Sequence, residues 1–139
     1  YEMVDTLKHA AKKGIDVKII MPHIPDKWYA FLVAKTYYEE LITAGVDIYE
    51  YTPGFVHAKV FVAVDVKASV GTVNLDYRSL YLHFECGVYL YKNAAIADVE
   101  EDFQRTLRSC QKITVQDCRK LAWYKKIIGK VLRIIAPLM

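Results

Sequence analysis

Residues 57–74 read HAKVFVAVDVKASVGTVN, and this stretch decides the architecture. Residues 57–64 and 68–73 are rich in β-branched and apolar residues, which favours two strands. The short polar segment at 65–67 predicts a turn between them. We therefore expect a hairpin whose second strand brings the end of the stretch back beside its beginning.

Helix and strand signals alternate on both sides of this hairpin. Helices are expected over 4–11, 28–42 and 94–110 (with Asn93 as an N-cap), strands over 17–21, 46–51 and 86–91, and a last helical region after a capping box at 114–117. Gly14 and Gly45 supply helix C-terminal stops. The pattern predicts an α/β fold, with a mixed β-sheet flanked by helices.

The composition is that of a globular chain with an uneven charge distribution. Its 139 residues are 54% hydrophobic, with 6 Gly and 4 Pro, which excludes a disordered or collagenous chain. Residues 1–118 hold 13 Lys/Arg and 16 Asp/Glu, a net charge of −3, whereas residues 119–139 hold 6 basic residues and no acid. We therefore predict a domain at 1–118 and a basic C-terminal helix at 119–139. No nucleic-acid partner is expected, because binding would need a basic face on the folded domain.

The cysteines and histidines give no sign of a metal site. The three Cys, at positions 86, 110 and 118, form no C-x-x-C pair, and together with the four His they show no zinc-ligand spacing. We expect reduced thiols, no metal and no cofactor.

Residues of the hairpin form a set that can carry phosphate chemistry. On a strand, His57 and Lys59 would share a face, which places a potential nucleophile beside a cation. Gly71 permits close approach of a substrate to the backbone. Thr72 and Asn74 bring side chains that can donate to phosphate oxygens. The set predicts an oxyanion cradle with a nucleophile in it.

Glu85 completes this set, because a carboxylate can accept from one imidazole nitrogen and leave the other free to act. Each of these residues also has a purely structural interpretation. A strand histidine is more often a satisfied structural residue, a lysine is usually solvated, and Gly-Thr-x-Asn is usually a turn. The joint spacing, rather than any one residue, favours the catalytic interpretation.

That spacing resembles the HKD motif of the phospholipase D superfamily, H-x-K-x4-D-x6-G-[ST]-x-N. The matching residues are His57, Lys59, Gly71, Thr72 and Asn74. The later glutamate of the superfamily corresponds to Glu85. The motif aspartate falls at Val64, and Asp65 stands one place further on. The resemblance gives that aspartate a supporting role in the fold, which Asp65 could take over through a small shift in the turn.

The resemblance is closest to the C-terminal half of bacterial cardiolipin synthases of the phospholipase D type. It rests on GTVNLDYRS at 71–79, HFEC at 83–86 and RIIAPLM at 133–139, and it extends over nearly the whole chain. It implies one half of a phospholipase D-like core, in which two HKD motifs meet at a pseudo-two-fold axis.

The resemblance also implies a mechanism that needs no metal. One histidine attacks the phosphodiester and forms a phosphohistidine, while the other protonates the departing alcohol. A phosphatidyl group then passes from one phosphatidylglycerol to another, and glycerol is released. In a C-terminal half, His57 would be the general acid/base, with Lys59 and Asn74 holding the non-bridging oxygens and Gly71 and Thr72 binding the phosphate.

One motif supplies only half of such a site. A second HKD half is implied, either from the same parent chain or from a second copy in a homodimer. Two other functions stay open: a homodimeric single-motif phosphodiesterase or nuclease, and an inactive membrane-binding fragment. The resemblance further implies the cytoplasmic face of a bacterial cell membrane, with N-terminal membrane spans in the parent that are absent here.

The basic tail has the pattern of an amphipathic helix. One arc of a helical wheel is apolar and holds Leu121, Tyr124, Ile127, Ile128, Val131, Leu132 and Ile135. This arc favours contact with an anionic bilayer. The membrane-contacting residues would be Trp123, Lys125, Lys126, Lys130 and Arg133. The alternative is a last helix packed on the domain with its charges in water. Gly129 weakens an isolated helix, so a partner surface is expected in either case.

Overall fold

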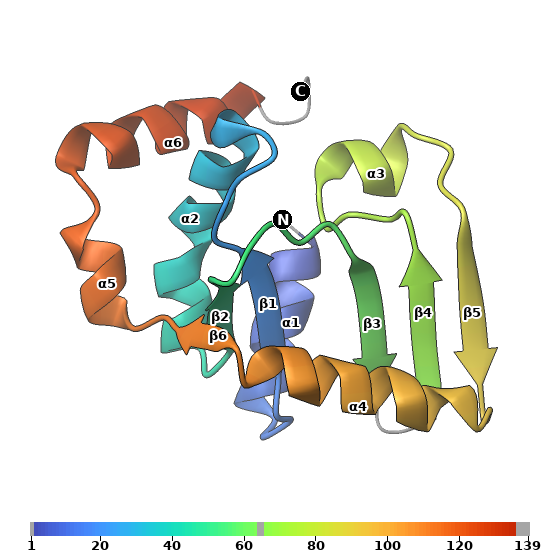
Figure 1. Ribbon diagram of the computed structural model, residues 1–139. Coiled ribbons are helices and arrows are strands. Elements are labelled where there is room, and N and C mark those ends of the chain that lie inside the picture. Colours follow the sequence, from blue (N-terminus) through green and yellow to red (C-terminus); the bar gives the residue numbers. More distant parts are fainter. Residues whose placement is uncertain (1, 64–65, 136–139) are drawn as a thin grey trace. The chain divides into compact units, whose positions relative to one another are not determined.

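The computed structural model describes residues 2–63 and 66–135, which form alternating helices and strands (Figure 1). They divide into two compact units. The first unit comprises the chain up to Phe55 together with the segment from Cys110 onward, and the second comprises Val56–Ser109. The predicted α/β class is confirmed.

The first unit holds a mixed three-stranded sheet. Its described elements are α1 (Glu2–Lys12), β1 (Lys18–Pro22), α2 (Trp28–Thr43), β2 (Asp47–Tyr51), β6 (Cys110–Lys112), α5 (Val115–Lys120) and α6 (Trp123–Ile135). β2 is the central strand, and it pairs in parallel with β1 and antiparallel with β6.

Glycines end α1 and α2, as the sequence predicted. Gly45 has a φ of +100°, in the left-handed region that favours glycine. Its N–H donates to the carbonyl of Ile42, and the N–H of Val46 donates to the carbonyl of Leu41. This pair of bonds satisfies two of the last helical carbonyls. The equivalent pair closes α1 around Gly14, which has a φ of +86°.

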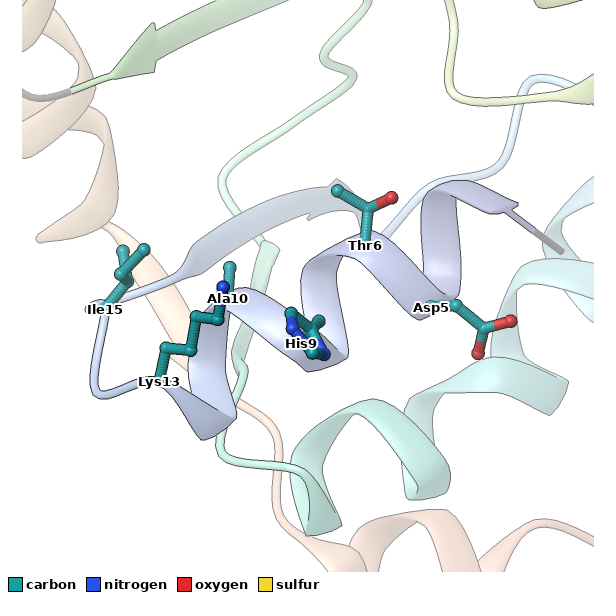
Figure 2. A pocket seen from close by; sticks show the side chains of 6 residues that line it. All are labelled: Asp5, Thr6, His9, Ala10, Lys13 and Ile15. Carbon is teal, nitrogen blue, oxygen red and sulfur yellow. The ribbon is translucent and has the colours of Figure 1, made fainter.

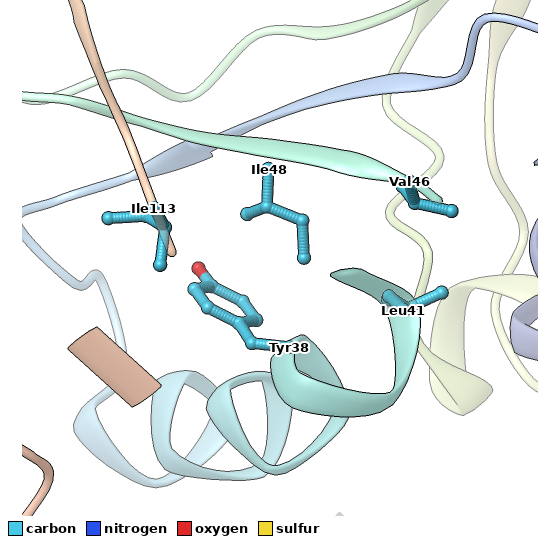
Figure 3. Close-up of a cluster of buried hydrophobic side chains, with 5 residues drawn as sticks. All are labelled: Tyr38, Leu41, Val46, Ile48 and Ile113. Carbon is cyan, nitrogen blue, oxygen red and sulfur yellow. The ribbon is translucent and has the colours of Figure 1, made fainter. Parts of the chain in front are cut away.

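The core of the first unit lies between α2 and β2. Figure 3 shows its buried side chains converging: Tyr38, Leu41, Val46, Ile48 and Ile113. Burial alternates along β2, because successive side chains of a strand point to opposite faces. Ile48 therefore points inward, and so does the residue two places on, Glu50.

Glu50 is an acidic residue with only 2% of its surface exposed. Its Oε2 lies 2.8 Å from Nδ1 of His23, and its Oε1 lies 3.2 Å from Nζ of Lys35. These partners offset the cost of removing a carboxylate from water. Burial, reinforced by the negative charge of Glu50, raises the pKa of the neighbouring Tyr38, whose hydroxyl therefore stays protonated at physiological pH.

The second unit is a three-stranded antiparallel sheet with a helix across it. Its described elements are β3 (Lys59–Ala63), β4 (Lys67–Gly71), α3 (Tyr77–Tyr81), β5 (Gly87–Tyr91) and α4 (Ala95–Leu107), with the strands in the order β3-β4-β5. Figure 1 shows α4 crossing the three strands. Ala68 on β4 and Ile96 on α4 are both buried. The predicted hairpin is confirmed as β3–β4.

Three predicted boundaries are wrong. β3 begins at Lys59, so His57 precedes the strand instead of opening it. β4 ends at Gly71 and not at position 73. The helix expected to reach Cys110 ends at Leu107, because Cys110 opens β6 and pairs with β2. Long-range pairing overrides a local helical pattern here.

Two further features differ from the prediction or refine it. Helix α3 was not predicted, although Asp76 caps it by accepting from the N–H of Ser79. The last helical region is two helices, because Leu121 has a ψ of 128° and interrupts it. The capping box of Thr114 and Asp117 is confirmed at the start of α5. The N-cap of α4 is Ala94 and not Asn93 as predicted, although the side chain of Asn93 accepts from the N–H of Ala95.

The buried ion pair of Glu50 can be tested by removing one partner. Lys35→Met leaves the Glu50 carboxylate buried with less compensation, so we expect the free energy of unfolding to fall by about 3 kcal/mol in urea denaturation. Lys35→Met combined with Glu50→Leu should recover most of that loss, since no charge then stays buried. A single mutant as stable as the wild type would contradict this role.

Candidate active site

At one end of the second unit's sheet, Lys59 has no side chain beside it on the neighbouring strands. Lys59 of β3 is opposite Gly71 of β4, which is in turn opposite Gly87 of β5. Residues directly opposite one another in a sheet project their side chains from the same face, and the two glycines have no side chain. The parts of β4 and β5 beside Lys59 are therefore backbone without side chains.

Gly71 is required by the backbone of β5. A Cβ at position 71 would lie 2.6 Å from the Cα of Gly87 and would collide with the carbonyl oxygen of Cys86. The sequence predicted that Gly71 admits a substrate to the backbone. The structure shows that the close neighbour is β5 itself, so this glycine sets the spacing of the two strands.

Thr72 forms hydrogen bonds with Cys86 and Glu85 at the end of this sheet. Its N–H donates to the carbonyl of Cys86 at 2.9 Å, and its hydroxyl accepts from the N–H of Cys86 at 3.0 Å. The same hydroxyl donates to the carboxylate of Glu85. The close approach at Gly71 is what puts Thr72 within reach of both residues.

Glu85 is held as a carboxylate by this arrangement. The hydrogen bond from Thr72 lowers the pKa of Glu85, and the hydroxyl of Ser79 lowers it further. The charges of His83 and Lys59 act in the same direction. The structure thus gathers Thr72, Lys59 and Glu85 at one end of the sheet. The predicted role for Glu85 was to accept from an imidazole, and here it accepts from a hydroxyl.

His57 is exposed and stands next to the cation of the site. Because β3 begins at Lys59, strand geometry does not fix the imidazole of His57, and the shared face expected for His57 and Lys59 stays a prediction. Instead, Nζ of Lys59 donates to the backbone carbonyl of His57 at 2.6 Å. The main chain that carries the imidazole is therefore held by the lysine.

Asn74 is exposed and is supported from α3. Its Nδ2 lies 3.4 Å from Oγ of Ser79, which has 8% of its surface exposed. Ser79 was missed as a site residue, yet it supports both Asn74 and Glu85. The signal was available in the sequence: an Asp three residues before Ser79 marks a helix N-cap and so fixes where Ser79 lies.

A second pair near the site was also missed. Nε of Arg78 donates to Nε2 of His83 at 2.6 Å. Val64 and Asp65, at the motif's aspartate position, lie outside the described residues. The supporting role expected of Asp65 therefore stays a prediction.

The hollow on α1 has a different character. It has a volume of about 470 Å³ and is lined by Asp5, Thr6, His9, Ala10, Lys13 and Ile15. Figure 2 shows these side chains along one helix and the turn after it. A binding site usually gathers polar groups from several elements, and this hollow does not.

Comparisons with known proteins show the family to which this chain belongs. Residues 1–107 match the family model described as "Cardiolipin synthase, PLD-like domain". This chain belongs to that family. The match spans the whole candidate site, from His57 to Glu85.

Individual relatives extend the likeness to 99% of the chain. An uncharacterized protein of Streptococcus mutans is 53% identical over 138 residues. Cardiolipin synthases of Clostridium perfringens and Halalkalibacterium halodurans are 40% and 38% identical. The chain covers 30%, 29% and 27% of these three proteins, so it spans less than a third of their length.

The strand spacing at Gly71 can be tested with alanine. Gly71→Ala places a methyl group against the backbone of β5, which should cost about 1–3 kcal/mol as overpacking does. We expect hydrogen exchange at the Thr72 amide to become roughly ten-fold faster or more. Gly54→Ala is the matched control, because a Cβ at Gly54 meets nothing within 4 Å. Equal exchange rates in the two variants would refute the constraint.

The hydrogen bond from Thr72 to Glu85 can be tested by titration. Thr72→Val keeps the β-branched shape but removes the hydroxyl, so the pKa of Glu85 should rise toward its ordinary value of 4.5, as followed by NMR of the carboxyl carbon. A lowered pKa in the folded state stabilises the protein fully above that ordinary value, and this stabilisation is lost as the pH falls through the lowered pKa. Thr72→Val should lose this pH dependence, and Ser79→Ala should lose a smaller part. An unmoved pKa in Thr72→Val would exclude the bond.

Proposed function

We propose that this chain supplies the C-terminal catalytic half of a cardiolipin synthase. The complete enzyme would transfer a phosphatidyl group between two phosphatidylglycerol molecules and release glycerol. One observation carries the proposal: the exposed His57 is bound through its backbone carbonyl to the ammonium of Lys59, a residue that has only Gly71 and Gly87 opposite it in the sheet. Family membership and the cardiolipin synthases among its relatives support the substrate class.

The groups around Lys59 suit the binding of a phosphodiester. Gly71 and Gly87 place no side chain beside Lys59, and the ammonium supplies charge to the non-bridging oxygens of a bound phosphate. Asn74, exposed and supported by Ser79, adds an amide donor. These groups neutralise the charge that builds up on the phosphate oxygens in the transition state, so no metal is needed for that task.

His57 acts as the general acid and then the general base. In the first step, the partner histidine's nitrogen forms a bond to phosphorus as the phosphorus–oxygen bond to glycerol breaks. The imidazolium of His57 gives its proton to the glycerol oxygen. In the second step, neutral His57 takes the proton of the incoming phosphatidylglycerol hydroxyl, whose oxygen displaces the partner histidine. Both imidazoles then return to their starting states.

Removing His57 should abolish most turnover in the complete protein that contains this segment. We expect His57→Ala to lower cardiolipin formation from phosphatidylglycerol vesicles by about 10²–10⁴-fold, the usual contribution of a positioned acid/base group. Cardiolipin is quantified by mass spectrometry. His9→Ala, on α1, is the matched control and should keep full activity. Undiminished turnover in His57→Ala would refute the proposal.

A substrate with a good leaving group separates the two histidine roles. A phosphatidyl ester of 4-nitrophenol needs little protonation of its leaving oxygen, so His57→Ala should still release one equivalent of nitrophenolate in a burst. Loss of that burst together with turnover would make His57 the nucleophile instead. Cleavage of DNA, lost in the same variant, would favour the nuclease alternative.

A further inference from the structure

Helix α6 is held to the protein by its small and polar face. Gly129 is buried, and a Cβ there would lie 2.7 Å from Cγ2 of Thr36 and 3.1 Å from the carbonyl oxygen of Leu32, both on α2. A glycine at this contact lets the two helices approach closely. Figure 1 shows α6 lying across α2 within the first unit.

Arg133 strengthens this contact with α2, and Lys126 joins α6 to α5. Arg133 lies over the ring of Tyr37, with Cζ 3.8 Å from its centroid, and its guanidinium is 3.8 Å from the carboxylate of Glu40. Nζ of Lys126 donates to the carbonyl of Arg119 at 3.3 Å. Lys126 and Arg133, expected at a lipid surface from the sequence, thus make contacts inside the protein.

The apolar face of α6 consequently points away from the protein. Its exposed residues are Trp123, Tyr124, Ile127, Ile128, Val131 and Ile134. Trp123 is 74% exposed and Ile134 is 77% exposed. At 100° per residue these positions occupy one continuous arc, on the side opposite Gly129. A helix that packed on the domain through its apolar stripe would show the reverse.

The charge around this face identifies its occupant. Lys125 and Lys130 are exposed and flank the arc on either side, and residues 119–139 contain no acid. An apolar strip with a Trp and a Tyr, bordered by lysines, complements the interface of an anionic bilayer. We propose that α6 is an interfacial helix, docked to α2 through Gly129 and inserting its outward face into an anionic lipid surface.

This proposal goes beyond the catalytic assignment, because it concerns only the first unit and any anionic lipid. In the described part of the chain, no helix is long and apolar enough to cross a bilayer. An interfacial helix needs only to lie in the headgroup region with one face buried. The proposal therefore stands or falls independently of what reaction the second unit performs.

Trp123 provides a direct probe in the full 139-residue chain. Trp28→Phe leaves Trp123 as the single tryptophan. On addition of vesicles containing phosphatidylserine, which is anionic but not the proposed substrate, we expect its emission to shift to the blue and to be quenched by brominated acyl chains. Vesicles of phosphatidylcholine alone should bind much more weakly. His57→Ala should bind like the parent, which separates this test from that of the catalytic proposal.

Paired variants test the two parts of the surface. Ile127→Gln with Ile134→Gln removes apolar contact, and its control is Ile15→Gln with Ile24→Gln, two exposed isoleucines elsewhere in the first unit. Lys125→Gln with Lys130→Gln removes charge, and its control is Lys12→Gln with Lys13→Gln on or beside α1. Each lysine near an anionic surface contributes roughly five-fold in affinity, so the charge pair should lose about thirty-fold. The apolar pair should lose at least about ten-fold, and both controls should keep the parent affinity.

Three results would overturn the proposal. The first is equal affinity in the α6 variants and their controls. The second is Trp123 emission that vesicles do not change. The third is a dimer that binds no vesicles and separates in Ile127→Gln with Ile134→Gln, which would make a second copy of the chain the occupant of this face.

Discussion

The closeness of β4 and β5 at Gly71 is the constraint on which the candidate site depends. Because no side chain fits between Gly71 and the backbone of Cys86, the strands approach until Thr72 bonds to Cys86 through both its amide and its hydroxyl. That hydroxyl then reaches Glu85. A larger residue at 71 would push β5 away and break these bonds together. One backbone contact thus fixes several polar groups, which is how a small sheet can preorganise a charged site.

A second glycine has the opposite consequence in the first unit. Gly71 allows the polar groups of Thr72, Glu85 and Cys86 to come together, whereas Gly129 lets α6 dock through a face with little apolar surface. The contact is completed by Arg133 on Tyr37 and Glu40. Burying the isoleucines instead would gain hydrophobic free energy within this chain, and the lipid contact proposed for α6 would supply that gain from outside it. An exposed apolar arc of this kind is typical of an interaction surface, which supports the lipid contact proposed for α6.

Local sequence signals predicted much of the fold but failed where contacts with distant segments determine the local structure. The helix ends at Gly14 and Gly45 follow from left-handed backbone, a property of the residue itself, and the capping box at Thr114 is equally local. The end of α4 was missed because Cys110 is drawn into pairing with β2, about 60 residues earlier in the chain. A helical wheel likewise divides α6 correctly into two faces, yet only the Gly129 contact shows which face is outward. Motif spacing predicted the candidate site residues, while Ser79 was missed because its contacts depend on α3.

The chemistry proposed for this site requires a second imidazole. A histidine that attacks phosphorus must be neutral, because its lone pair forms the new bond, and a histidine that protonates the leaving alcohol must carry a proton at the same moment. One imidazole cannot hold both states in one step. His57, beside the Lys59 ammonium, can fill either role but not both. Since the chain spans less than a third of its relatives' length, the remainder of such a protein is the natural source of the second group, and a second copy of this chain is the other. The two sources differ in symmetry: a copy would bring two chemically identical histidines, so their division into acid and nucleophile would have to arise from the bound phosphodiester.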